Sequence, residues 1–267
     1  MYSNVVLGQY LPGNSLIHRL DPRLKIGLLM LMLVTVFFPC GFWGYLLIFA
    51  YLCVAQTLSG ISVKRVISAI KPMLVMLVFL LIFNVLLIRT GRVVATLGPV
   101  TVYSGGLYQS LYIAVRLVLI VMMTTLLTAT TKPLDMTLGL EHLLSPLRKI
   151  GFPTYEVAMM ISIALRFIPT LLEETQRIMK AQASRGVDFN EGTFREKVTS
   201  VISLIIPLFI SAFQRADDLA NAMESRNYNP HAKRTRYHQL RWQGFDTAAL
   251  LISLLVSGIA IAMSFVL

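Results

Sequence analysis

Two tripeptides carry the side chains best suited to specific chemistry in this sequence, Ser184-Arg185-Gly186 and Ser225-Arg226-Asn227. A guanidinium group offers a rigid, planar fork of donors to a carboxylate or to backbone carbonyls. Gly and Asn readily adopt the left-handed conformation just past a helix end, so each arginine is expected at the last helical position. Such an arginine either only complements the helix macrodipole or docks on a partner protein. Its repetition at matching positions favours docking.

The stretches that precede the two tripeptides predict long helices. We expect these helices to cover Thr154 to Arg185 and Glu191 to Arg226, far longer than a typical soluble helix. Their N-terminal halves are apolar and their C-terminal halves are amphipathic. Pro169 and Pro207 fall within or just after the apolar halves, and we expect them to kink or break the helices.

Catalytic signatures are missing from the sequence. The phosphate-binding pattern Gly-x4-Gly-Lys-Ser/Thr does not occur, so the chain is not expected to be an ATPase. The pair Glu173-Glu174 is one residue too close to Arg177 for the glutamate motif of intramembrane prenyl-protein proteases. All four histidines lie outside the apolar spans, which argues against a metal or general-base centre in the membrane. They are His18, His142, His231 and His238. We therefore expect a chain that is not an enzyme and binds no cofactor or metal itself.

Composition indicates a polytopic membrane protein. Hydrophobic residues make up 56% of the 267 residues, charged residues 14%, and the mean hydropathy is +0.70. The net charge is +11, but the basic residues cluster beside apolar runs and form no stripe with interleaved aromatics, which argues against nucleic-acid binding. Cys40 and Cys53 fall in apolar segments, so no structural disulfide is expected.

Five apolar stretches are long enough, or nearly long enough, to cross a bilayer. They run from about Ile26 to Phe38, Phe42 to Leu58, Met73 to Ile88, Leu107 to Thr130 and Thr247 to Val266. The apolar halves of the two long helices are left open as further spans. Asp21 and Pro22 suit the N-cap and the first position of the first membrane helix.

Charge distribution predicts three segments and their orientation. Residues 1–131 hold the N-terminal segment and four membrane helices, residues 132–241 a cytoplasmic coupling-helix region, and residues 242–267 the last membrane helix. The middle segment contains 15 of the 24 Lys and Arg and 11 of the 13 Asp and Glu, so it should be largely cytoplasmic. Basic residues precede the first span, which places the N-terminus in the cytoplasm and, after five spans, the C-terminus outside.

Arg116 interrupts the fourth apolar stretch about nine residues from its start, roughly 13 Å along a helix axis. A charge at this depth is costly, so the side chain should face protein or reach toward the nearer interface. We expect a structural or interface role rather than direct contact with a substrate.

The sequence resembles the transmembrane T component of energy-coupling factor (ECF) transporters. The segment from Gly8 to Lys25 is similar to the opening of that family, and the two Ser-Arg tripeptides match its paired x-Arg-x motifs, which in many members read Ala-Arg-Gly. Asn227 departs from the usual Gly, although Asn also suits that position of a helix end. The resemblance spans the whole chain.

This resemblance implies an all-α, L-shaped integral membrane protein of the bacterial plasma membrane, with a membrane bundle and long coupling helices crossed as an X. It implies that Arg185 and Arg226 dock in grooves of two ABC-type ATPases, which would bind the ATP and Mg²⁺. The flanking residues would shape this presentation; they are Ser184, Gly186, Ser225 and Asn227. The apolar helix faces would hold a separate membrane-embedded S component that binds a vitamin or another micronutrient.

Two other classes stay open at this point. A transporter with its own substrate path should show internal repeats or broken helices with polar residues at the midplane. A membrane-bound enzyme would need a catalytic set that the sequence lacks.

Overall fold

The computed structural model describes residues 10–97, 100–146, 153–189, 192–229, 240 and 242–266. The described chain is helical apart from one short β-hairpin, so the all-α membrane fold is confirmed. The chain divides into two compact units. Unit 1 comprises Met1–Leu144 and Leu240–Leu267, and unit 2 comprises Ser145–Gln239.

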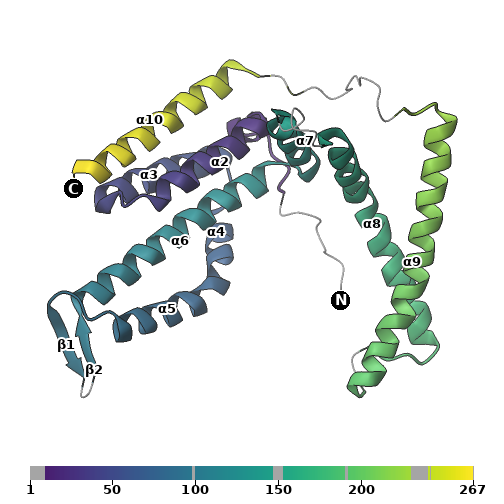
Figure 1. Cartoon of the computed structure of the whole chain (residues 1–267), viewed down its shortest axis with the longest axis horizontal. Helices are drawn as coiled ribbons and strands as arrows, with labels where there is room; N and C mark the ends of the chain where they lie inside the picture. Colours follow the sequence, from purple (N-terminus) through teal and green to yellow (C-terminus); the bar gives the residue numbers. More distant parts are fainter. Residues whose placement is uncertain are drawn as a thin grey trace. The chain divides into compact units, whose positions relative to one another are not determined.

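Unit 1 is a helical bundle with a hairpin at one loop (Figure 1). Its helices are α1 (Leu16–Arg19), α2 (Pro22–Phe37), α3 (Gly41–Ser59), α4 (Val63–Ile70), α5 (Leu74–Leu87), α6 (Ser104–Thr130), α7 (Pro133–Leu144) and α10 (Gly244–Val266). A 3-10 turn, Lys71–Met73, joins α4 to α5. Strands β1 (Val93–Leu97) and β2 (Val100–Tyr103) pair in antiparallel fashion before α6.

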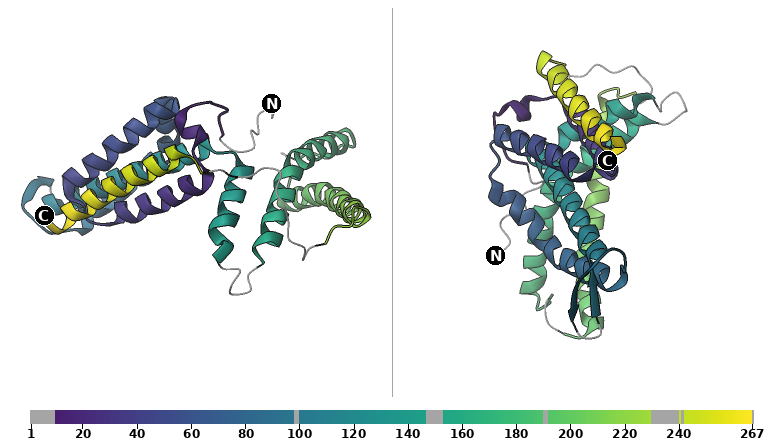
Figure 2. Two further views of the ribbon diagram at one scale, coloured as in Figure 1. Left: turned by 90° about the horizontal axis from the view of Figure 1, so that it is seen from above. Right: turned by 90° about the vertical axis from the view of Figure 1, so that its left-hand side faces the viewer.

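The core of unit 1 lies where α2, α3, α6 and α10 meet. Helix α10 packs along both α2 and α3, as Figure 2 shows, and α6 contacts the same two helices. Val36, Ile48, Leu119 and Ala260, one from each helix, are fully buried at this junction. The bundle is therefore closed by its last helix, although that helix is more than a hundred residues from α6 in sequence.

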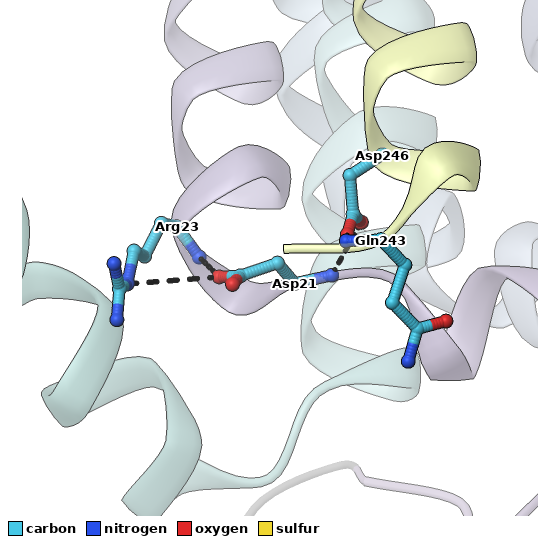
Figure 3. Close-up of polar contacts among 4 residues, drawn as sticks. All are labelled: Asp21, Arg23, Gln243 and Asp246. Carbon is cyan, nitrogen blue, oxygen red and sulfur yellow. Dashed lines mark hydrogen bonds and ion pairs between the residues drawn. The ribbon is translucent and has the colours of Figure 1, made fainter. Parts of the chain in front are cut away.

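Carboxylates tie the start of α2 to the start of α10 (Figure 3). Asp21 caps α2 by accepting a hydrogen bond from the Arg23 amide at 2.8 Å, and Pro22 is the first helical residue, as predicted. Asp246 is only 1% exposed and accepts hydrogen bonds from the Asp21 amide at 2.8 Å and the Gln243 amide at 2.7 Å. One buried side chain thus fixes both helix starts.

Unit 2 consists of two long helices, α8 (Thr154–Ser184) and α9 (Phe194–Ser225). Both are continuous through their prolines, so neither Pro169 nor Pro207 breaks its helix. Helix α9 begins with a capping box in which Thr193 and Glu196 satisfy each other's backbone amides. This exchange fixes the start of α9 four residues after the left-handed Gly192 region would allow a sharp turn from α8 to α9.

Six helical segments within the described ranges are long and apolar enough to span a membrane. Four lie in unit 1, namely α3, the run Val63–Leu87, α6 and α10, and the other two are α8 and α9. The expected first span, α2, has 16 residues and is about 24 Å long, less than the bilayer core of about 30 Å. The sequence count of five therefore differs by omitting α8 and α9 and including α2.

Two elements of unit 1 were not predicted. The third span begins ten residues earlier than expected, because Val63 to Met73 are already helical and carry Lys64, Arg65 and Lys71 on helices rather than in a loop. The hairpin was also missed, because its strands have only five and four residues. The available signal was the pair of β-branched runs on either side of Gly98-Pro99 in the sequence.

Candidate docking site at the ends of α8 and α9

Contacts between α8 and α9 show that the two helices run antiparallel. Met159, near the start of α8, accepts a hydrogen bond on its sulfur from the Tyr228 hydroxyl, which follows α9, at 2.9 Å. Near the end of α8, Gln182 contacts Ser203 in the first third of α9. Figure 1 shows the two helices crossing between these points. Their C-terminal ends consequently lie at opposite ends of the pair.

Pro207 creates one of the contacts between the helices. A proline has no amide hydrogen, so the carbonyl four residues earlier, that of Ser203, loses its helical donor. The Gln182 amide nitrogen on α8 donates to that same carbonyl at 3.4 Å. The proline therefore leaves an acceptor that α8 satisfies, and this accounts for its place in a continuous helix.

Glu174 makes a second contact near the middle of the pair. One of its carboxylate oxygens accepts a hydrogen bond from the Ser211 hydroxyl at 2.7 Å, and the other forms an ion pair with Arg215. Both partners lie on α9, one turn apart. The side chains of Glu174 and Arg215 are 22% and 33% exposed, so the pair is partly shielded from water.

The end of α8 is a Schellman motif. Gly186 adopts φ = 83°, its amide donates to the Ala183 carbonyl at 3.0 Å, and the Val187 amide donates to the Gln182 carbonyl at 3.1 Å. An L-residue at position 186 would meet no atom within 4 Å, so only the backbone conformation favours glycine here.

The end of α9 repeats this motif bond for bond. Asn227 adopts φ = 56°, its amide donates to the Glu224 carbonyl at 2.8 Å, and the Tyr228 amide donates to the Met223 carbonyl at 3.0 Å. Asn227 is the only non-glycine residue with positive φ among those that the structure describes. The departure from glycine at this position is thus accommodated without a change of geometry, as the sequence predicts.

Each arginine lies one residue beyond its predicted place. The helices end at Ser184 and Ser225, and Arg185 and Arg226 are the C-caps, with φ near −90° and ψ near 10°. In a Schellman motif the residue before the left-handed one is only half helical, which explains the shift. The two backbone geometries differ by no more than 6° in ψ and 2° in φ, so the two arginines leave their helices in the same way.

All six residues of the two tripeptides are exposed. Over the described residues, neither Arg185 nor Arg226 takes part in an ion pair; the pairs found there are Arg23 with Asp21 and Arg215 with Glu174. The rise from Ser203, beside the end of α8, to Ser225 corresponds to about 33 Å of helix. The pair of helices therefore presents two free guanidinium groups that are too far apart for one small pocket.

Arg116 lies in unit 1 and does not join this site. It faces protein, as expected, with its guanidinium beside the rings of Phe37 and Tyr112 and its Nε donating to the Tyr45 hydroxyl at 3.4 Å. The histidines that the structure describes also lie elsewhere: His18 bonds to Ser15 and to the Leu11 carbonyl, and His231 and His238 fall outside the described residues. No cluster of three potential metal ligands occurs within the described residues.

Sequence reasoning missed the side chains that join the two helices, namely Gln182, Glu174, Ser211 and Arg215. Glu174 was considered only with its neighbour Arg177, whereas its partner in the structure is 41 residues away. The repeated Gln-Arg pairs Gln176-Arg177 and Gln214-Arg215 were the available signal, because they mark equivalent positions in the two helices.

Comparison with known proteins places the whole chain in one family. The model of the family described as Cobalt transport protein matches residues 13–237. A Thermosediminibacter oceani protein named energy-coupling factor transporter transmembrane protein EcfT is 46% identical over 247 residues, which cover 92% of this chain and 93% of the relative. Proteins of the same name from Bacillus subtilis and Lactococcus lactis are 42% and 44% identical, and the alignments cover 96% and 95% of both chains, respectively.

Proposed function

Because the chain belongs to the family of energy-coupling factor transporter transmembrane proteins, we propose that it transmits motion from two ATP-hydrolysing subunits to a separate substrate-binding subunit in the membrane. The substrate of such a transporter would be a vitamin or another micronutrient. Selectivity for it would lie in the substrate-binding subunit rather than in this chain.

The duplicated Schellman ends of α8 and α9 are the observation that carries this proposal. Two exposed arginines leave two antiparallel helices with the same backbone geometry, at opposite ends of the pair. A docking role explains this repetition, because two similar subunits need two similar contacts. Macrodipole compensation alone would not require the same tripeptide pattern at both ends.

Links between α8 and α9 support a mechanical role. Gln182 and Glu174 tie α8 to α9 at two points about two helical turns apart. Rigid helices that are joined in this way convert displacement of one end into displacement of the other. A change in the distance between two docked ATPases would therefore alter the crossing of the helices.

An exposed apolar face of α9 supports contact with the lipid bilayer or with the substrate-binding subunit. Val198, Ile202, Ile205 and Phe209 follow one another at helical spacing and are between 42% and 61% exposed. Coupling requires such a face, because the force that reaches the crossing must be passed to another membrane protein.

A transporter with its own substrate path is not favoured. Such proteins bind substrates where helices are broken near the midplane. Within the described residues, α8 and α9 are unbroken although each contains a proline. We propose instead that α8 and α9 serve as coupling helices on the cytoplasmic side, with the N-terminus in the cytoplasm and the C-terminus outside.

Reconstitution tests the proposal. The purified chain alone should hydrolyse no ATP, whereas a complex with two ABC-type ATPases and a substrate-binding subunit should hydrolyse ATP and take up substrate. Turnover by the isolated chain that persists after contaminating ATPases are inactivated would refute the non-catalytic role. Uptake by this chain in the absence of any substrate-binding subunit would favour the transporter with its own path.

A further inference from the structure

Arg116 is held entirely by neutral groups. Its Cζ lies 5.3 Å from the centre of the Phe37 ring and 5.1 Å from that of Tyr112. Its Nε donates to the Tyr45 hydroxyl at 3.4 Å, and that hydroxyl donates to the Val36 carbonyl at 2.9 Å. These contacts hold the guanidinium in place, but they do not balance its charge.

The chain supplies no carboxylate near Arg116. No Asp or Glu occurs in the sequence between Asp21 and Asp135, so α2 to α6 contain none. Asp21 and Asp246 lie at the N-terminal end of α2, whereas Arg116 contacts Phe37 at its C-terminal end, about 24 Å away along that helix. An unbalanced charge among apolar groups is costly. The balancing anion must therefore come from outside this part of the chain.

An apolar groove between α3 and α6 runs past this arginine. Its volume is about 360 Å³, and Tyr45 and Tyr112, the two tyrosines that hold Arg116, are among its lining residues. The rest of the lining is apolar and includes Phe42, Leu46 and Phe49 from α3 and Leu111, Val115 and Val118 from α6. Phe42 is 70% exposed and Leu111 64%, so the groove is open along one side.

We propose that Arg116 and this groove bind one anionic phospholipid, with its phosphate on the guanidinium and an acyl chain between α3 and α6. A guanidinium fork matches two phosphate oxygens and remains charged at any physiological pH. The groove extends from Tyr108 to Leu119, about 16 Å along α6, which is close to half of the 30 Å hydrocarbon core. Its length thus suits the chain of one leaflet. This site does not depend on the proposed coupling role.

Lipid titration of the full-length chain tests the site. Native mass spectrometry would count the molecules of phosphatidylglycerol or phosphatidylcholine retained by the protein from a mild detergent. Wild type should retain one phosphatidylglycerol about tenfold more tightly than phosphatidylcholine. Arg116→Gln should remove this preference, and Arg116→Lys should retain part of it because the charge remains but the fork is lost. Arg89→Gln removes an exposed arginine away from the groove and should behave as wild type.

Filling the groove provides a second and independent variant. Leu111→Trp changes an exposed groove residue, leaves the charge intact and should weaken retention of phosphatidylglycerol about as much as Arg116→Gln. If Arg116→Gln does not fold, this variant decides. An undiminished preference for phosphatidylglycerol in either folded variant would overturn the proposal. Loss of a co-purifying membrane protein from Leu111→Trp, with lipid retention unchanged, would assign the groove to that protein instead.

Discussion

Glu174 on α8 and Arg215 on α9 form an ion pair across the contact between the two long helices, and Ser211 donates to the same carboxylate. Neither residue belongs to the arginine tripeptides. The pair lies about three helical turns from the end of each helix. It therefore links the two docking ends without taking part in docking.

Removal of this link should uncouple transport from ATP hydrolysis. In Glu174→Gln and Arg215→Gln the partner charge stays partly buried without compensation, which costs about 1–3 kcal/mol and loosens the crossing. Substrate uptake per ATP hydrolysed should fall, while ATPase co-purification should be retained. Glu173→Gln is the matched control, because Glu173 is an exposed neighbour. Unchanged uptake per ATP in both single variants would refute the link.

Charge reversal at both tips should abolish transport. Arg185→Glu with Arg226→Glu removes two charge-assisted contacts, each worth about 1.5–3 kcal/mol when docked, and adds repulsion if the partner grooves are acidic. Membrane insertion should be unaffected, since both residues are exposed.

The control for the tips reverses two exposed charges on the same helices, Arg177→Glu with Lys197→Glu. The measurements are uptake normalised to folded protein and ATPase co-purification. Wild-type values in the Arg185 and Arg226 double variant would leave those arginines with helix capping alone.

The left-handed residues allow the geometry of the tips to be tested apart from their charge. Gly186→Ala should cost about 1–2 kcal/mol, because an L-residue must adopt φ = 83°, although no atom lies near its Cβ. Asn227→Gly should be neutral or slightly stabilising. Gly258→Ala, in open space within α10, is the control for added volume. Thermal unfolding and ATPase binding would be measured together, and equal stability of Gly186→Ala and wild type would contradict the backbone argument.

Reporter fusions decide the topology. A reporter after Leu267 should be active only outside the cell, and one inserted near Asn190, a position outside the described residues, only in the cytoplasm. The opposite result at Leu267 would mean that the number of crossings is even. Activity outside the cell at position 190 would mean that α8 crosses the membrane, as its length and composition allow.

Loss of the Asp246 carboxylate should destabilise unit 1. Asp246→Ala leaves the buried Asp21 amide without its acceptor, at a cost of about 1–3 kcal/mol. Asp217→Ala, which removes an exposed carboxylate on α9, should change the unfolding temperature little. Comparison of the two variants by thermal unfolding in the same detergent separates a specific effect from general loss of negative charge.

Local sequence signals were sufficient for much of the fold and of the candidate site. Gly186 and Asn227 revealed both helix ends, and Asp21-Pro22 revealed the start of α2, because capping depends on a few adjacent residues. Contacts such as Glu174 with Arg215 have no local signature, since they depend on how two distant helices pack. The span count also failed, because α8 and α9 combine apolar and polar halves that composition alone can assign either to the membrane or to its surface.

The bond between Asp246 and the Asp21 amide has a consequence for biosynthesis. Helix α2 leaves the ribosome more than two hundred residues before α10, so its N-terminal junction lacks a partner during almost the whole of translation. A chain that ends early would keep that amide unsatisfied and the α2 and α3 surface uncovered. Membrane quality control would then have a local feature by which to recognise incomplete chains, and the last helix to be made would complete the first.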